Sequence, residues 1–344
     1  MRSLFTTAVV FFFILFGCKE MQRQSAQIVL SEEDKALIAS ANRYFSTLPE
    51  PGDPNTAIAI LGKRLYFEKA ISANGEMSCN TCHPIDHYGV DNLPVSPGFD
   101  GTLGTRNSPT TLNAWFHATQ FWDGRSPDLT DQAKGPPLNP IEMGLSSPKD
   151  VEDILAGLPG YQEMFSEAFP GEAQPVTFDN FAKALAAFQE TLATPAAFDA
   201  FLEGAAHALS DVQKQGLRLF IDTGCIVCHS GPGLGGNNMF RFGLVHGPYY
   251  KLTGSEFRDP GVAGLTGNEA DKYVFKTPGL RNVEMTAPYF HDGSVESLAE
   301  ATRIMAYAQL GRELDNEQIG AIVEFYRSLT GEIPKHAIEG NSAD

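Results

Sequence analysis

Two short segments of the chain share the pattern C-x-x-C-H, and they limit its possible folds more than any other feature. They are Cys79-Asn80-Thr81-Cys82-His83 and Cys225-Ile226-Val227-Cys228-His229. Two cysteines at this spacing can form thioether bonds to the two vinyl groups of one porphyrin, and the following histidine then lies beneath the iron. The spacing is the attachment signature of haem c. We therefore predict two covalently bound haem c groups, with His83 and His229 as proximal iron ligands.

Three other uses of these cysteines explain the pattern less well. A zinc site usually combines cysteine pairs about 15–20 residues apart, whereas these pairs lie in different halves of the chain. Redox-active dithiols would leave the histidine after each pair as a coincidence, and a disulfide within C-x-x-C closes a cramped loop. Of the five cysteines, only Cys18 lies outside the two motifs.

The first residues have the pattern of a bacterial export signal. Arg2 gives a positive start, and the apolar run 8–16 is much shorter than the about 20 residues that span a bilayer. Cys18 lies where a lipoprotein cleavage box needs its cysteine, so we predict a signal peptide over 1–17 and a lipid-anchored linker over 18–30. An ordinary signal that happens to precede a cysteine is the alternative. We expect the protein in the periplasm or cell envelope, held to a membrane only through Cys18.

The chain is acidic, with a formal net charge of −17 at pH 7. Such a surface argues against binding to nucleic acid or to an anionic membrane face, and it would steer a partner that carries a basic patch. The charge is equally compatible with the simpler role of keeping an envelope protein soluble.

The surroundings of the two motifs repeat coarsely, which predicts two related domains. The repeated features are residues 62–66 and 216–220 before the motifs, and Arg106-Asn107 and Arg281-Asn282, then 121–124 and 290–293, after them. We predict a mainly α fold of two cytochrome c-like haem domains packed side by side. The N-terminal domain would cover 31–195 and the C-terminal domain 196–335, with a tail over 336–344.

Apolar residues at helical spacing predict helices over 31–48, 178–192, 297–310 and 315–329. The segments 84–112 and 230–280 are rich in Gly, Pro and Asn, so we expect loops that wrap the haems.

The sixth ligand of each iron decides between electron transfer and chemistry on a small molecule, because a thioether closes the site and a vacant position opens it. In the second domain the candidates are Met239, Met285, Met305, His246 and His291. Met305 lies on the predicted helix 297–310. In the first domain no fixed ligand is evident among Met143, His87 and His117, and His87 is too near His83 to reach the opposite haem face.

Several stretches together resemble the bacterial dihaem cytochrome c peroxidases over nearly the whole mature chain. They are the first C-x-x-C-H motif, residues 106–110, 120–125 and 132–136, Glu142-Met143, and residues 275–293. The resemblance implies an N-terminal haem that reduces hydrogen peroxide and a C-terminal haem that accepts electrons. It also implies Met305 as the axial ligand of the second iron, and a homodimer as the common assembly.

The same resemblance gives roles to three more side chains. Gln132 and Glu142 match a pair in the peroxide pocket, where the carboxylate would move a proton between the two oxygens and the amide would orient the peroxide. Trp122 matches a tryptophan between the haems, a candidate electron relay. Taken alone, Glu142 would be a solvated glutamate at a helix start and Trp122 a core aromatic.

The family also carries calcium between the haems. Asn107, Thr286 and Pro288 match its ligands, through one side chain and two carbonyl groups, and Ca²⁺ takes oxygen ligands of this kind. Taken alone, Asn107 would be a loop-capping residue.

One position departs from the family. Counting back from Arg106-Asn107, the family's removable distal histidine falls at Phe99, and a phenyl ring cannot ligate iron. Many members open this site only after the second haem is reduced. We hypothesise that the first iron of this protein is already open, unless His87 or His117 replaces the missing histidine.

Together these features favour a periplasmic peroxidase that reduces H₂O₂ with electrons from a small c-type cytochrome or a cupredoxin. Two other functions stay open. A dihaem oxidase that matures a partner protein's tryptophan-derived cofactor fits an open first iron, but such enzymes have a tyrosine where this chain has Met305. A dihaem electron-transfer cytochrome without catalysis would need two six-coordinate irons and no Glu142.

Overall fold

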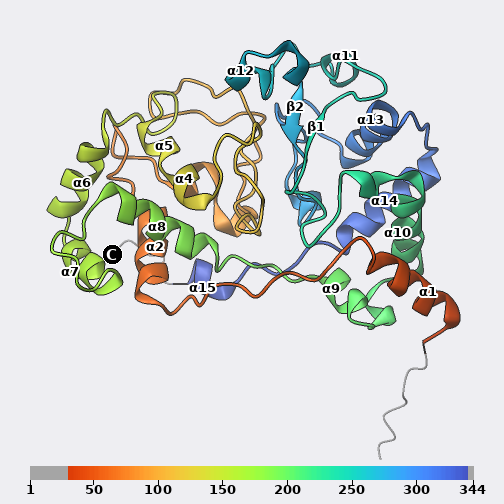
Figure 1. Ribbon diagram of the computed structural model, residues 1–344, viewed down its shortest axis with the longest axis horizontal. Coiled ribbons are helices and arrows are strands. Elements are labelled where there is room, and N and C mark those ends of the chain that lie inside the picture. Colours follow the sequence, from red (N-terminus) through yellow and green to blue (C-terminus); the bar gives the residue numbers. More distant parts are fainter. Residues whose placement is uncertain (1–29, 340–344) are drawn as a thin grey trace, which may run out of the picture.

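The computed structural model describes residues 30–339. The predicted signal peptide, Cys18, almost all of the linker and the end of the tail lie outside this range. Within it the chain is predominantly helical, and its one sheet has two short strands. Two helical lobes lie side by side, with long loops between them (Figure 1). The predicted mainly α fold is confirmed, whereas the assignment of one haem to each lobe stays a prediction.

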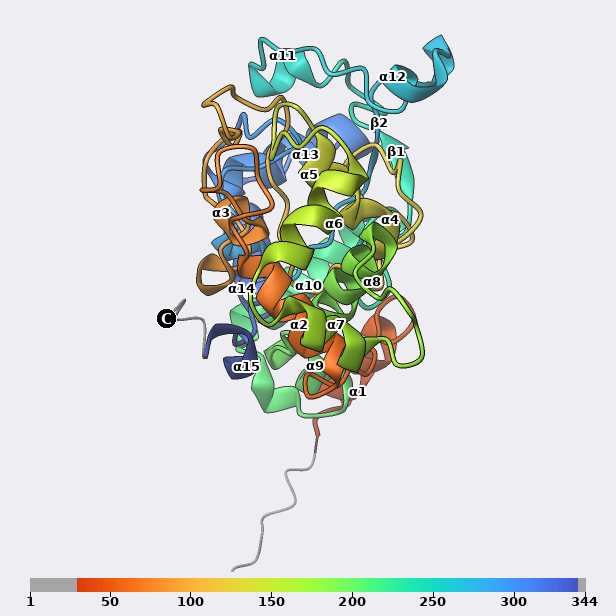
Figure 2. The same ribbon diagram turned by 90° about the vertical axis from the view of Figure 1, so that its left-hand side faces the viewer.

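The first lobe is organised around a close helix pair. Its helices are α2 (Ala57–Phe67), α3 (Cys79–Cys82), η1 (Ile85–His87), α4 (Leu129–Ala133), α5 (Gly135–Leu138), α6 (Pro148–Gly157), α7 (Tyr161–Ala168) and α8 (Phe178–Gln189). Helix α2 packs along α8, while α6 and α7 form the outer end of the lobe (Figure 2). A Cβ atom at Gly62 of α2 would lie 1.8 Å from the carbonyl oxygen of Ala184 in α8. Only glycine permits so close an approach.

The second lobe repeats this arrangement. Its helices are α1 (Glu32–Ala41), α9 (Ala197–Leu202), η2 (Ala206–Ala208), α10 (Asp211–Thr223), η3 (Cys225–Val227), η5 (Val283–Met285), α13 (Leu298–Leu310) and α14 (Asn316–Arg327). Helix α10 packs along α14, and a Cβ atom at Gly216 would lie 1.9 Å from the carbonyl oxygen of Ala321. The similarity between residues 62–66 and 216–220 therefore reflects two helix pairs with the same close contact.

Local capping explains why three of the predicted helices begin where they do. The side chain of Thr177 accepts the amide of Asn180 at the start of α8, and Ser297 does the same for α13. Asp315 and Gln318 form a capping box at the start of α14, which satisfies amides that have no partner within the helix. All three helices agree with the predicted ranges to within three residues. Helix α1 is shorter than the predicted range 31–48, since it ends at Ala41.

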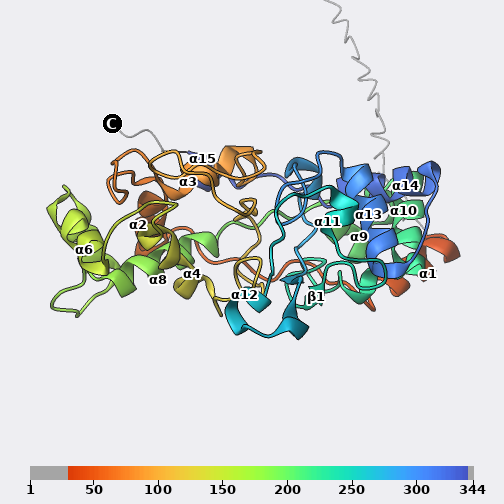
Figure 3. The ribbon, with the colours of Figure 1, turned by 90° about the horizontal axis from the view of Figure 1, so that it is seen from above.

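The start of the described chain packs on the second lobe, although the predicted boundaries give it to the first, and the predicted tail packs on the first lobe. Leu37, Ala41 and Phe45 are buried in the core of the second lobe, and Figure 3 shows α1 beside α9 and α10 of that lobe. Helix α15 (Lys335–Ile338) instead lies on the first lobe, where Ala337 is buried in its core. The ring of His336 also contacts the hydroxyl of Thr191 at 3.0 Å. The predicted division at residue 195 is thus crossed by the N-terminal segment that includes Leu37 and Phe45.

Loops and a small sheet fill the space between the lobes. Strands β1 (Met239–Arg241) and β2 (Val274–Lys276) pair antiparallel, with Met239 opposite Lys276. The segment between them contains α11 (Tyr250–Thr253), α12 (Ala263–Thr266) and η4 (Glu269–Asp271). No helix within residues 30–339 is long and apolar enough to span a bilayer.

Candidate active site and haem-binding cavities

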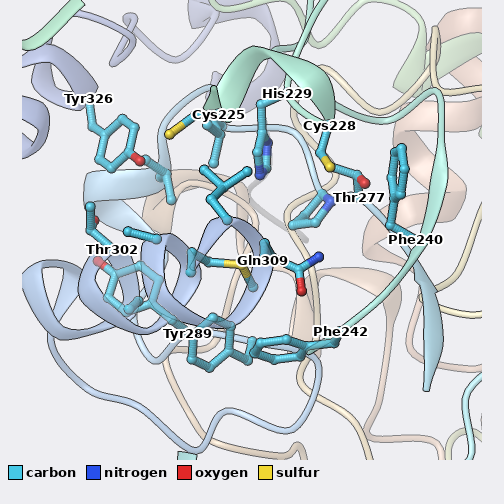
Figure 4. A pocket seen from close by; sticks show the side chains of 18 of the residues that line it. Cys225, Cys228, His229, Phe240, Phe242, Thr277, Tyr289, Thr302, Gln309 and Tyr326 are labelled. Atoms are coloured by element: carbon cyan, nitrogen blue, oxygen red, sulfur yellow. The ribbon is translucent and has the colours of Figure 1, made fainter. Parts of the chain in front are cut away.

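The second C-x-x-C-H motif lines a largely apolar cavity of about 160 Å³ with many aromatic side chains. Cys225, Cys228 and His229 border it on one side, opposite aromatic rings that include Phe242 and Tyr289 (Figure 4). The Nδ1 atom of His229 lies 2.9 Å from the carbonyl oxygen of Leu234. A carbonyl only accepts, so Nδ1 carries the proton and Nε2 is left as the metal ligand. The donor set fits a haem c held by two thioethers and one imidazole.

The structure narrows the candidates for the sixth ligand of the second iron. Of the five proposed side chains, only Met305 and His291 line this cavity. His291 stacks on Phe275 with ring centroids 4.0 Å apart. Met305 projects from α13, and among the described residues it is the one thioether on the cavity wall. The geometry therefore fits Met305 as a ligand, a role that stays a prediction.

The first C-x-x-C-H motif lines a larger cavity of about 550 Å³. Helix α3 carries Cys79 and Cys82, whose thiols are free, and His83 follows at its end. The Nδ1 atom of His83 lies 3.2 Å from the carbonyl oxygen of Gly89, and burial lowers the pKa of its imidazole. A neutral ring with Nδ1 as donor presents Nε2 as a ligand, as in the second cavity.

The structure brings the other residues predicted for the first haem to this same cavity. They are Gln132, Glu142, Trp122, Asn107, Thr286 and Pro288. Gln132 comes from α4, Glu142 from the turn after α5, and Thr286 and Pro288 from the loop after η5. Their predicted roles differ, but all six residues line the first cavity, and they come from both lobes.

Glu142 is held in place by its own turn. The amide nitrogen of Asn139 donates to Oε1 of Glu142 at 2.7 Å, and the backbone of Phe99 donates to the Glu142 carbonyl at 2.8 Å. Burial raises the pKa of the Glu142 carboxyl, although the Asn139 hydrogen bond and the charge of Arg125 oppose the rise. A partly buried carboxyl with a raised pKa is suited to exchanging a proton near neutral pH.

Phe99 does not line the first cavity, although Ser96, Pro97 and Gly104 of the same loop do. Its ring lies against Gly144, where a Cβ atom would come within 2.3 Å of the ring. The side chain therefore points away from the place where a distal ligand would bind. His87 does not line the cavity either, whereas His117 lies on its wall.

Comparison with known proteins assigns the chain to a family. A family model described as di-haem cytochrome c peroxidase matches residues 56–207. The chain is 45% identical over 307 residues to the cytochrome c551 peroxidase of Pseudomonas aeruginosa, covering 87% of this chain and 88% of that protein. The chain belongs to the di-haem cytochrome c peroxidase family. It is also 41% identical over 302 residues to the cytochrome c551 peroxidase of Nitrosomonas europaea, with 87% of each protein covered.

A solved structure has the same fold. The crystal structure of a MauG-like protein associated with microbial copper homeostasis matches with a TM-score of 0.74 at 26% identity, covering 85% of this chain and 95% of that chain. As a di-haem cytochrome c peroxidase, the protein is an enzyme with two haem c cofactors and hydrogen peroxide as substrate. The predicted family and enzyme class are confirmed.

The wall between the two cavities of this peroxidase includes Trp122. Seven residues line both cavities: Trp122, Lys276, Pro278, Leu280, Val283, Tyr289 and Phe290. The indole nitrogen of Trp122 donates to the carbonyl of Asn107 at 2.8 Å, and its own carbonyl accepts the amide of Lys276 at 2.7 Å. Trp122 is therefore fixed where an aromatic relay between two haems would be needed.

The three predicted calcium ligands line the first cavity from two loops, one with Asn107 and one with Thr286 and Pro288. The amide nitrogen of Asn107 donates to the carbonyl of Leu93 at 2.9 Å, which fixes the orientation of its side chain. Asn92 donates to the carbonyl of Ala287 at 2.7 Å, which ties the same loop to the second lobe. An amide oxygen and backbone carbonyls suit Ca²⁺. Residues 30–339 contain no cluster of three His, Cys, Asp or Glu side chains that could hold a metal.

Sequence reasoning missed the ion pairs made by the repeated Arg-Asn pairs. Arg106 bonds Asp123 at 2.5 Å and Asp259 at 2.6 Å, while Arg281 bonds Asp199 at 2.7 Å. Each arginine thus links segments far apart in the chain. The repetition of the Arg-Asn pair was the available signal, but its acidic partners have no fixed spacing.

Proposed function

We propose that this protein is a cell-envelope peroxidase that reduces H₂O₂ to two waters, using two electrons from a small basic cytochrome c or a cupredoxin. The observation that carries the proposal is the position of Glu142. This buried carboxyl, with its raised pKa, shares one cavity with Cys79, Cys82 and His83. A cavity built only for electron transfer has no need of an ionisable side chain there.

The residues of the chain divide the chemical work in the first cavity. Cys79, Cys82 and His83 would hold the haem, which supplies the iron and electrons for cleaving the O–O bond. Glu142 would take the proton from the near oxygen of peroxide and return it to the far oxygen, which leaves as water. Gln132 would hold the peroxide for this transfer. Two protons and two electrons then balance one H₂O₂ against two H₂O.

Electrons would enter at the second cavity, where Cys225, Cys228, His229 and Met305 would hold the other haem. Its thioether ligand favours a high potential and leaves no position for peroxide. Trp122, in the wall shared by the cavities, would carry electrons to the first haem.

Several features of the assembly follow from the sequence and the relatives. The charge of −17 would attract a donor with a basic patch, and the two peroxidases compared are named for cytochrome c551. We propose a lipid anchor at Cys18, a Ca²⁺ ion bound by Asn107, Thr286 and Pro288, and a homodimer.

We also propose that the first iron needs no reductive activation. Phe99 stands where the family has its removable histidine, and its ring packs on Gly144 outside the cavity. Nothing on this loop can then close the iron.

Peroxide turnover with a reduced, basic monohaem cytochrome c tests the proposed function. We expect fully oxidised enzyme to start turning over without a lag. Haem-loaded protein that does not oxidise the reduced cytochrome on addition of peroxide would overturn the proposal.

A further inference from the structure

Lys276 is a buried cation between the two cavities. It ends strand β2, the residue lines both cavities, and it is only 8% exposed. Its backbone N–H donates a hydrogen bond to the carbonyl of Trp122, and it pairs with Met239 in the sheet. These two contacts fix its position in the wall. Its ammonium donates to the carbonyl of Thr119 at 3.0 Å and lies 3.4 Å from Nδ1 of His117.

The other cations on these walls already have carboxylate partners. Among the described residues, Arg106, Arg125 and Arg281 are the remaining Lys or Arg side chains that line either cavity. Each forms an ion pair with an aspartate: Arg106 with Asp123 and Asp259, Arg125 with Asp123, and Arg281 with Asp199. Within residues 30–339, Lys276 has no carboxylate at ion-pair distance.

The neighbours of Lys276 do not supply the missing charge. Burial lowers the pKa of His117 to about 3, so its ring is neutral, and its Nδ1 accepts from Lys276 without adding a charge. Burial also lowers the pKa of Lys276 to about 8, with Asp123 too remote to reverse the shift. A buried ammonium is costly unless an anion pairs with it, so the wall needs an anion at this point.

We propose that Lys276 binds a propionate carboxylate of haem at the wall between the cavities. Each haem c carries two propionates and no other anionic group, and Lys276 borders both haem cavities. The resulting ion pair anchors the haem edge nearest Trp122, and the positive charge favours the reduced iron. This inference rests on haem occupying the cavities as in the proposed function, but not on peroxide chemistry.

Lys276→Gln in the holoenzyme tests the proposal by spectroelectrochemical titration. Loss of the charge should lower the equilibrium constant for reduction of one haem by about tenfold, which is about 59 mV for one electron. The spectrum of the haem that shifts identifies which propionate is bound. Lys272→Gln is the matched control, because Lys272 lies on the same segment, pairs with Glu269 and is exposed. Solvent screens that charge, so neither potential should move.

A pyridine haemochrome assay of each variant separates haem loading from the potential. Lys276→Arg keeps the charge and should load two haems at nearly unchanged potentials. If the Gln variant loads poorly while the Arg variant loads fully, the charge is required and the proposal stands. Two haems with unchanged potentials in Lys276→Gln would overturn it, as would equal loss of haem in both variants, which would make Lys276 a packing residue only. Inactivity with intact loading and shifted potentials would count against the peroxidase function alone.

Discussion

The two cavities are built on the same arrangement of helices and C-x-x-C-H motif, but different side chains line them. In both lobes a C-x-x-C-H motif follows a helix that packs, through a close glycine contact, on a helix later in the chain, and the histidine of the motif donates Nδ1–H to a loop carbonyl. The first cavity is the larger, and loop residues supply Glu142 and Arg125 to its wall. The second is narrow and aromatic, and helix α13 supplies Met305. In the proposed function the shared scaffold would hold each haem, and the side chains opposite the histidine would decide what each iron can do.

Of the substitutions proposed here, Glu142→Gln should have the largest effect, because it removes the side chain that most distinguishes the first cavity from the second. Removing the proton carrier is expected to lower kcat by about 10²–10⁴-fold, while both haem spectra and potentials stay as in the wild type. Steady-state oxidation of reduced cytochrome c measures the effect. Glu167→Gln, at an exposed position of α7, is the control. A Glu142→Gln enzyme with full turnover would remove Glu142 from the mechanism.

The pH profile sharpens the same prediction. Glu142 must be ionised to accept the first proton, and burial raises its pKa above the usual 4.5. Activity should therefore be present above that raised pKa and fall as the pH drops through it, at a higher pH than for an exposed glutamate. This acid limb should be absent from the residual activity of the Gln variant.

Met305→Leu should make the second iron resemble the first. Without a thioether the potential of the second haem should fall, since methionine ligation raises it. A tenfold smaller equilibrium constant for its reduction corresponds to about 59 mV for one electron, and turnover with a cytochrome donor should drop with it. Loss of the near-infrared methionine–iron absorption band checks the ligand directly. Met285→Leu, at an exposed site off the cavity, should leave that band and the turnover unchanged. A persistent band in Met305→Leu would assign the sixth position to another residue.

Alanine at the two contact glycines tests whether the lobes share one scaffold. A Cβ atom at Gly62 or Gly216 would collide with a carbonyl of the partner helix, so each substitution should cost about 1–3 kcal/mol. Gly320→Ala on α14 meets nothing within 4 Å and should instead stabilise by about 0.5–1 kcal/mol. Denaturant unfolding of the holoenzyme compares the three. Equal behaviour of Gly62→Ala and Gly320→Ala would argue against the close contact.

Phe99→His should have the smallest effect, because residue 99 faces away from the first iron. Its carbonyl accepts from Asn74 at 2.7 Å and its amide donates to the Glu142 carbonyl at 2.8 Å, so the loop is held by its backbone. We expect the spin state of the first haem to be the same in Phe99→His as in Phe99→Ala. A new bis-histidine, low-spin signal in the His variant alone would show that the loop can swing inwards.

Local sequence patterns predict much of this structure. The capped, periodic segments that became α8, α13 and α14 were predictable because each helix buries one face and starts at a capping side chain. The C-x-x-C-H motifs were predictable because haem attachment fixes the spacing. Met305 and Glu142 needed the family resemblance, since a lone methionine or glutamate has no chemical signature of its own.

Other features depend on contacts that no local pattern encodes. Phe45 packs on the second lobe and not on the first as expected, and Ala337 of the predicted tail is buried in the first lobe, because burial is decided by where the chain returns after long loops. The outward packing of Phe99 depends on Gly144, a glycine that leaves space for its ring. Lys276 lies in an apolar strand segment, and its lack of a counter-ion emerges only once the aspartates of the wall are paired with arginines.

Low-temperature electron paramagnetic resonance of the fully oxidised protein tests the central claim most directly. An open first iron with no distal side chain should give a high-spin ferric signal, alongside a low-spin signal from the methionine-ligated second iron, before any reductant is added. Two low-spin signals in the oxidised enzyme would contradict the account, because both irons would then be closed to peroxide.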